Sequence, residues 1–181
     1  MVLTVIKNWD KENWLSSKNY ILNFNSFLAK TNKLDSNSKI LDIGCGRGKI
    51  VGSLKSTFKL KFKPIGIDLV SHKDRDKRIE FKKIDALSFF STNKKKFDLI
   101  LVKQTIHLLK MSEIKTLFVE MKKSLKPKGK IMIFSLDPHK NEIPNFKLMR
   151  LKLFKSLKKE KKIIEFISKS YPKRIIKYFS Y

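Results

Sequence analysis

The sequence predicts an α/β protein in which helices cover both faces of a mostly parallel β-sheet. Short apolar segments alternate with amphipathic segments as far as residue 135 of the 181 residues. This order is typical of parallel sheets with right-handed crossovers. Residues 97–102 are almost continuously apolar, as expected of a central strand that is covered on both sides. The chain length is that of one domain with a sizeable core.

Residues 40–48, Ile-Leu-Asp-Ile-Gly-Cys-Gly-Arg-Gly, are the stretch around which the chain is organised. The apolar residues around Asp42 predict a short buried strand, and the three glycines that follow at every second position predict a turn almost free of side chains. Because glycine has no Cβ, a ligand can approach the backbone of such a turn closely. Apolar residues at helical spacing in 49–58 predict a helix after the turn, whose free N–H groups favour a polar or anionic ligand such as a nucleoside-type cofactor.

The other expected elements follow from the periodicity of apolar residues. Asp10 is expected to cap a helix within residues 10–30, and Ser112 a second helix, because short polar side chains accept hydrogen bonds from the first N–H groups of a helix. The remaining expectations are strands at residues 63–67, 78–84, 97–102 and 130–135, helices at 49–57 and 112–125, and a turn at 126–129.

The chain is strongly basic, with a net charge of +26. Such a charge suggests a nucleic acid or an anionic membrane as partner. Only five of the 42 basic residues are arginine, however, and arginine is preferred for bidentate contacts to phosphate and guanine. Lysine, isoleucine, asparagine and phenylalanine also share A/T-rich codons. We therefore favour codon bias over a polyanion-binding surface as the cause of the charge.

Cysteine and histidine usage excludes several kinds of site. The single cysteine, Cys45, excludes an intramolecular disulfide and a Cys-rich zinc site. His72, His107 and His139 share no metal-ligand spacing, so no metal is expected. No apolar run reaches the roughly 20 residues needed to cross a bilayer, and the N-terminus does not resemble a signal peptide. The sequence thus predicts a cytoplasmic protein without a transmembrane segment.

The glycine stretch resembles motif I of the class I S-adenosylmethionine-dependent methyltransferases, with Asp42 at the acidic position. Its glycine spacing, G-x-G-x-G, differs from the G-x-G-x-x-G fingerprint of dinucleotide-binding proteins. The resemblance covers residues 14–135 and is closest to the small-molecule, type-11-like branch. It implies a Rossmann-like three-layer sandwich and S-adenosyl-L-methionine as cofactor.

The resemblance also implies a set of cofactor-binding residues. Asp68 ends the second strand, where a carboxylate can accept hydrogen bonds from both ribose hydroxyls, although a strand-end aspartate can also simply cap a turn. Asp85 is the expected partner of the adenine amino group, and the backbone N–H of the next residue is expected to bond the ring. The expected cofactor-binding residues are Asp42, Gly44, Cys45, Gly46, Gly48, Asp68, Leu69, Asp85, Ala86, Lys103 and Gln104.

His107 is the candidate general base, because imidazole titrates close to neutral pH and this histidine follows the fourth strand. The alternative is that it only begins the helix containing Leu108 and Leu109. A small-molecule acceptor is favoured, with RNA as the alternative substrate and a non-catalytic nucleotide-binding or interaction module as the alternative class. The motif of an Asn or Asp followed by Pro-Pro and an aromatic residue is absent, which argues against methylation of adenine N6 or of glutamine.

The two ends of the chain depart from the pattern of a complete fold. Trp9, Trp14 and Tyr20 are candidates for a lid over the cofactor, with core packing as the alternative. Residues 1–136 are expected to form the cofactor-binding core, and 137–181 a Lys-rich segment with helices at 146–157 and 159–168 that caps the substrate. The sheet is expected to lack its last antiparallel strands, either because the chain is truncated or because residues 175–181 form one edge strand of a reduced fold.

Overall fold

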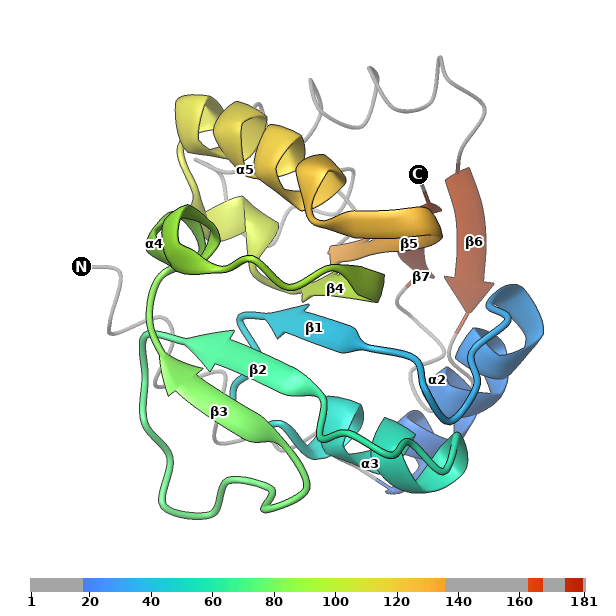
Figure 1. The fold of residues 1–181 in the computed structure, drawn as a ribbon. Helices are drawn as coiled ribbons and strands as arrows, with labels where there is room; N and C mark the ends of the chain where they lie inside the picture. The colour runs from blue at the N-terminus through green and yellow to red at the C-terminus, as the bar shows by residue number, and fades with distance from the viewer. Residues whose placement is uncertain (1–17, 136–162, 168–174, 181) are drawn as a thin grey trace.

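The computed structural model describes residues 18–135, 163–167 and 175–180. They form three layers, in which a sheet lies between two pairs of helices (Figure 1). The expected α/β class and Rossmann-like sandwich are confirmed. The helices are α2 (Lys18–Thr31), α3 (Lys49–Thr57), α4 (Ala86–Thr92), η2 (Ile106–Leu108) and α5 (Met111–Lys123), and the strands are β1 (Ile40–Ile43), β2 (Ile65–Asp68), β3 (Glu80–Lys83), β4 (Phe97–Lys103), β5 (Leu125–Ser135), β6 (Ile163–Ile167) and β7 (Ile175–Ser180).

The seven strands have the order β3-β2-β1-β4-β5-β7-β6. The first five pair in parallel, as expected: Leu41 of β1 lies opposite Ile65 of β2 on one side and Ile100 of β4 on the other. All five therefore end at the same edge of the sheet. The glycine turn after β1 lies at that edge, at the point where the strand order reverses, and ligands of open α/β sheets bind at such a point.

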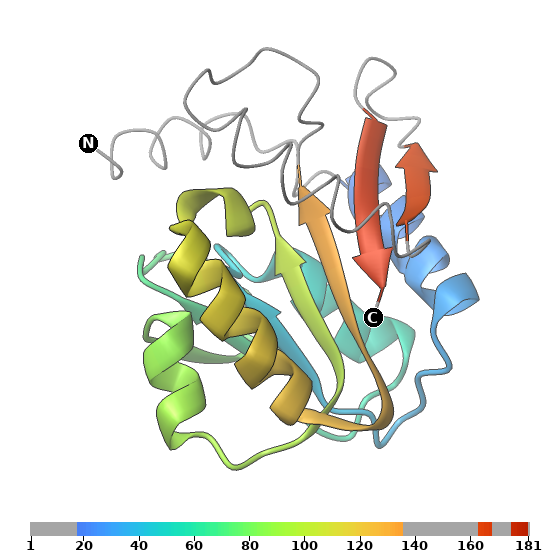
Figure 2. The same ribbon diagram turned by 90° about the horizontal axis from the view of Figure 1, so that it is seen from above.

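The expectation that the sheet lacks its last antiparallel strands is wrong. β7 pairs antiparallel with β5, and β6 pairs antiparallel with β7, so that the two strands lie side by side beyond β5 (Figure 2). The helix expected at 159–168 is also wrong over β6, whose sequence Ile-Ile-Glu-Phe-Ile is rich in the β-branched and aromatic residues that favour strands. A strand is present within 175–181, but β7 lies between β5 and β6 and is not the edge strand that was expected. Residues 146–157 lie outside the described part of the chain.

The core consists of two apolar clusters, one on each face of the sheet. One joins the strands to α4 and α5 through residues such as Phe89 and Leu117, and the other joins them to α2 and α3 through residues such as Phe24 and Leu54. The Phe24 ring meets that of Phe134, on β5, edge to face with centroids 4.8 Å apart. This packing fixes the helices against the strands and so keeps the loops at the carboxyl edge in place.

Two local expectations need correction near α5. Ser112 does not cap this helix, since it lies inside it; the Glu113 carboxylate instead accepts a hydrogen bond from the backbone N–H of Lys110 at 2.6 Å. The turn expected at 126–129 is an irregularity within β5, where pairing with β4 shifts. None of the helices in the described part of the chain combines the length and apolarity needed to span a bilayer.

Candidate functional site

The glycine turn that follows β1 is held in a left-handed backbone conformation. Gly44 and Gly46 have φ values of +72° and +53°, a region that residues with a Cβ adopt at a cost. A Cβ added to Gly44 would lie 1.9 Å from Oγ1 of Thr105, whereas one added to Gly46 would have no neighbour within 4 Å among the described residues. Gly44 is therefore required for packing, and the backbone at Gly46 faces open space that a ligand can enter.

The end of β2 fastens this turn. The carbonyl oxygen of Ile67 accepts hydrogen bonds from the N–H groups of Gly44 and Cys45, at 2.9 and 3.0 Å. The Asp68 carboxylate accepts from the N–H of Gly46 at 2.8 Å through Oδ2 and from that of Val70 at 2.9 Å through Oδ1. Each carboxylate oxygen can accept a further hydrogen bond. Asp68 is thus placed beside the turn, as expected, and it also holds the turn in shape.

Asp42 is the buried acid of the site, with 2% of its surface exposed. Its Oδ1 has no hydrogen-bond partner among the described residues. Asp42 lies opposite Leu101 of β4, so Lys103, two residues further on, projects from the same face of the sheet. Burial raises the pKa of Asp42; the charge of Lys103 lowers it, and that of Asp68 raises it further. Burial also lowers the pKa of Lys103.

The end of β4 lies beside the turn. Thr105 donates its hydroxyl hydrogen bond to the carbonyl oxygens of Ile43 and Lys103, at 3.2 and 3.0 Å, and so links β4 to β1. Gln104 has a φ of +53°, and its side-chain Oε1 and Nε2 are buried without a hydrogen-bond partner in the described part of the chain. Buried polar atoms are nearly always paired, so these atoms are suited to contact a polar ligand.

Asp85, Ala86 and Leu69 lie further along the same edge. Oδ1 of Asp85 accepts a hydrogen bond from the N–H of Ser88 at 2.9 Å and caps α4, which begins at Ala86. Hydrogen bonding from the side chain and then the backbone of Ser88 lowers the pKa of Asp85, so the exposed group is a carboxylate at neutral pH. Leu69 is 64% exposed. These residues follow β2 and β3, as the sequence predicted.

The side chains of Cys45 and His107 differ in how far the structure describes them. Burial raises the pKa of the Cys45 thiol, which therefore stays protonated and inert. A Cβ on Gly66 would lie 2.8 Å from Sγ of Cys45, so this side chain packs against β2. His107 lies in η2, three residues after Gln104; its side chain lies outside the described part of the structure.

Sequence reasoning missed residues that fix the loop between β2 and β3. Arg75 donates a hydrogen bond to the carbonyl oxygen of Val70 at 2.7 Å, and its guanidinium lies 3.1 Å from the centroid of the Phe81 ring. Arg47, inside the glycine stretch, pairs with Asp74 at 2.7 Å. No sequence motif signals these contacts, because they join positions of variable spacing. Within the described residues, no group of three His, Cys, Asp or Glu could hold a metal ion.

The comparison with protein families identifies the domain. Residues 40–129 match the family model of a methyltransferase domain. This stretch contains β1, the glycine turn and the ends of β2, β3 and β4, which together carry every candidate cofactor-binding residue. The resemblance predicted from the sequence is therefore confirmed. No curated protein matches the sequence.

Solved methyltransferase structures share the fold. The plantazolicin methyltransferase BpumL, in complex with a monoazolic desmethylPZN analog and SAH, is 17% identical over 98% of this chain and 88% of its own, with a TM-score of 0.64. The N-methyltransferase NodS from Bradyrhizobium japonicum WM9 is 18% identical over 96% of both chains, with a TM-score of 0.59. The mitomycin 7-O-methyltransferase MmcR is 15% identical over 90% of this chain and 55% of its own, with a TM-score of 0.54.

Proposed function

Residues 40–129 are a class I S-adenosylmethionine-dependent methyltransferase domain, and on this premise we propose that the protein methylates a small-molecule acceptor. The single observation that carries the methyl-transfer part of this proposal is the bare turn at Gly46 beside the carboxylate of Asp68, where the cofactor would bind. The chain shares its fold with BpumL, NodS and MmcR, which are described as a plantazolicin methyltransferase, an N-methyltransferase and a mitomycin 7-O-methyltransferase. These descriptions support a small acceptor.

The residues at the carboxyl edge of the sheet fit this cofactor. S-adenosylmethionine has donors that suit carboxylates, namely the ribose hydroxyls, the adenine amino group and the α-ammonium group. We assign the ribose to Asp68, the adenine amino group to Asp85 and the amino-acid end to Asp42, with Gln104 offering both a donor and an acceptor. The orphaned Oδ1 of Asp42 and the orphaned amide of Gln104 gain partners in this arrangement. The remaining contacts assigned to the cofactor are those of Gly44, Cys45, Gly48, Leu69, Ala86 and Lys103.

The protein's own contribution to the reaction is positioning. The cofactor supplies a methyl group that its sulfonium already activates. The chain must hold the acceptor atom in line with that methyl group, and fixed geometry of this kind supplies much of the rate. We propose that His107, just past the end of β4, takes the proton that the acceptor atom loses, since imidazole exchanges protons near neutral pH.

Calorimetry with S-adenosylhomocysteine tests the cofactor assignment. Asp68→Ala removes an acceptor of two ribose hydroxyls, and a hydrogen bond to a charged group contributes about 1.5–3 kcal/mol, so its affinity should fall at least about tenfold. Asp74→Asn, which changes an exposed acid of the same loop that pairs with Arg47, is the matched control and should bind normally. Equal binding by both variants would contradict the assignment.

Asp68→Ala also removes the hydrogen bond that Asp68 accepts from the N–H of Gly46 in the turn. A second measurement must therefore separate a disturbed turn from a lost ribose contact. Thermal unfolding without ligand shows whether Asp68→Ala has disturbed the turn. Asp85→Ala tests the contact to adenine and leaves the glycine turn unchanged. A folded Asp85→Ala variant with reduced affinity supports the arrangement. If it binds as tightly as the parent protein, Asp85 is not the adenine contact.

The role of His107 is tested by the pH dependence of methyl release. His107→Gln should abolish the acidic limb of the rate profile, where a general base loses activity on protonation, and should leave S-adenosylhomocysteine binding unchanged. An unchanged profile would show that His107 only serves the helix in which it lies.

A further inference from the structure

A second hollow lies at the opposite edge of the sheet from the glycine turn. It has a volume of about 560 Å³ and is lined where β1, β2, β3 and β4 begin, by residues that include Lys39, Lys61, Phe62, Lys63 and Lys95. β4 extends from Phe97, in this lining, to Lys103 beside the cofactor residues. At about 3.3 Å per residue this separates the two sites by about 20 Å. The hollow is therefore no part of the methyl-transfer site.

Lysine dominates the lining. Within the described residues, Lys39, Lys61 and Lys63 make none of the ion pairs of the structure, and all three are exposed. The one acid in the lining, Glu80, is shared between Lys95 at 3.8 Å and a further lysine at 3.6 Å. Exposed pairs at these distances are weak. The hollow thus has an excess of positive charge that its own residues do not neutralise.

The hollow also exposes an aromatic ring. Phe62 is 55% exposed, and Nζ of Lys39 lies 5.7 Å from its ring centroid. The other phenylalanines whose side chains the structure describes all belong to, or pack against, the two core clusters. An exposed ring beside unpaired lysines is the combination with which proteins bind nucleotides, because a base stacks on the ring while the phosphates meet the ammonium groups.

The lysines gather around this edge of the sheet. The connections at 32–39, 58–64 and 93–96, which lead into β1, β2 and β4, together carry eight lysines and one acid, Asp35. Codon bias raises the number of lysines over a whole surface, but it places neither a hollow nor an exposed phenylalanine among them. The local arrangement therefore needs a physical explanation of its own.

We propose that this hollow binds a nucleotide, either free or as a unit of single-stranded RNA, with the base against Phe62 and the phosphates on Lys61, Lys63 and Lys39. The volume lies within the range of about 300–1,000 Å³ that is usual for small-ligand pockets. Lysine acts on phosphate as a point charge, so this site recognises phosphate and an aromatic base without selecting a sequence. The site is independent of the acceptor and of the methyl-transfer reaction.

Fluorescence anisotropy and calorimetry with uridine ligands test this proposal, on full-length protein saturated with S-adenosylhomocysteine so that the cofactor site is filled. Uridine 5′-diphosphate and a short oligouridylate distinguish the two sources of the nucleotide: tighter binding of the oligonucleotide assigns the site to RNA, and equal binding to a free nucleotide. Phe62→Ala should weaken either ligand about tenfold, since stacking on one ring contributes about 1–3 kcal/mol per base.

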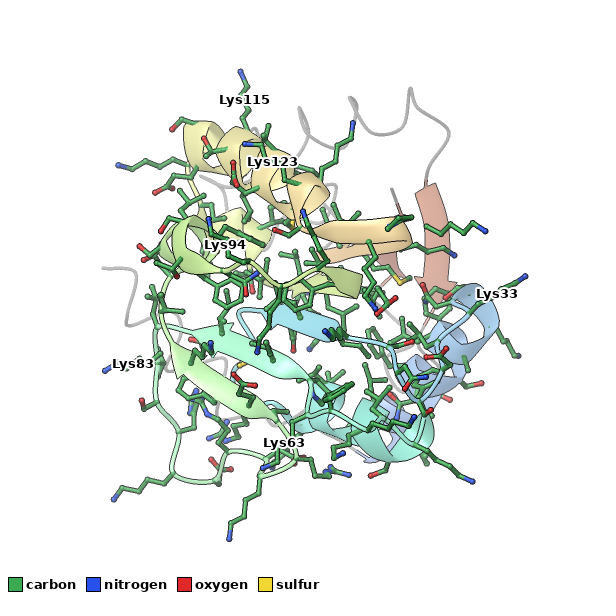
Figure 3. The ribbon with its side chains drawn as sticks, in the orientation of Figure 1. Lys33, Lys63, Lys83, Lys94, Lys115 and Lys123 are labelled. Carbon is green, nitrogen blue, oxygen red and sulfur yellow. The ribbon has the colours of Figure 1, made fainter. Side chains whose placement is uncertain are left out.

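Matched variants separate the hollow from the overall charge. Lys61→Glu/Lys63→Glu should weaken binding at least about tenfold and reduce its salt dependence, whereas Lys115→Glu, on the far side of the molecule from Lys63 (Figure 3), should change it less than about twofold. Leu22→Ala is the control for Phe62→Ala, because Leu22 is 56% exposed on α2. The side chains that change are all exposed, so folding should be preserved.

Three results would overturn the proposal. The first is that neither uridine ligand binds. The second is that Lys115→Glu weakens binding as much as Lys61→Glu/Lys63→Glu does. The third is that inorganic tripolyphosphate binds as tightly as the uridine ligands and Phe62→Ala has no effect, which would reduce the hollow to a patch for any polyanion.

Discussion

Replacing Gly44 with alanine should destabilise the protein by about 2–5 kcal/mol, because two separate costs add at this position. The backbone φ of +72° costs a residue with a Cβ about 1–2 kcal/mol. The new Cβ would also lie 1.9 Å from Oγ1 and 2.8 Å from Cβ of Thr105. Rotation of the Thr105 side chain relieves the first overlap but not the second, so the backbone must shift, and such overpacking costs about 1–3 kcal/mol.

Gly46→Ala is the matched control for this prediction. Its φ of +53° carries the same backbone cost of about 1–2 kcal/mol, but its Cβ would meet nothing within 4 Å in the described structure. Gly46→Ala should therefore remain well folded and should instead lose affinity for S-adenosylhomocysteine, because its methyl group enters the space assigned to the cofactor. The two glycines differ in function although their spacing in the sequence makes them look equivalent.

A double-mutant cycle measured by urea unfolding without ligand isolates the overlap. Thr105→Gly alone should cost about 1–2 kcal/mol, since it removes two hydrogen bonds to backbone carbonyls. In the Gly44→Ala background it should instead restore stability, with a coupling free energy of about 2 kcal/mol. Additive costs, or a Gly46→Ala variant as unstable as Gly44→Ala, would refute this account of the turn.

Three further predictions concern the scaffold around the site. Phe134→Ala should lower the free energy of unfolding by about 3–5 kcal/mol in urea titrations, because the ring is fully buried against α2. Asp85→Ala should cost about 1 kcal/mol by removing the cap of α4, whereas Asp85→Asn should retain its stability, since asparagine caps helices equally well. Burial opposes ionisation of Asp76, but the hydrogen bonds that it accepts from Arg78 hold its pKa below the ordinary value of 3.8. The stabilisation from this pair is therefore present above about pH 4 and is lost below it. Between pH 7 and pH 3, the free energy of unfolding in urea should fall less for Asp76→Asn than for the parent protein.

Local sequence patterns were sufficient to predict where the candidate site residues lie, because these residues follow the ends of strands. Asp68 and Asp85 each follow a strand, and parallel strands bring their carboxyl ends to one edge whatever the length of the helices between them. The contact between Gly44 and Thr105 could not be predicted in this way. It depends on which residues of β1 and β4 lie side by side, and the register between two strands is a property of the folded sheet.

The C-terminal strands show the same limit. The sequence of β6 is apolar and short, so its periodicity does not distinguish a helix from a strand. Its state is decided by pairing with β7, and that of β7 by pairing with β5 some 40 residues earlier in the chain. Pairing with a distant segment is a tertiary interaction, and it overrides a weak local preference.

The sequence by itself determined the order of strands and helices, the glycine turn and the acids at the strand ends, because these depend on the conformational preferences of neighbouring residues. Only the tertiary structure decided that Gly44 packs against Thr105, that β7 completes the sheet beside β5, and that Lys61, Phe62 and Lys63 share a hollow with Lys39. The physical reason is that each of these features brings together segments far apart in the chain, and their meeting is determined by the packing of the whole domain.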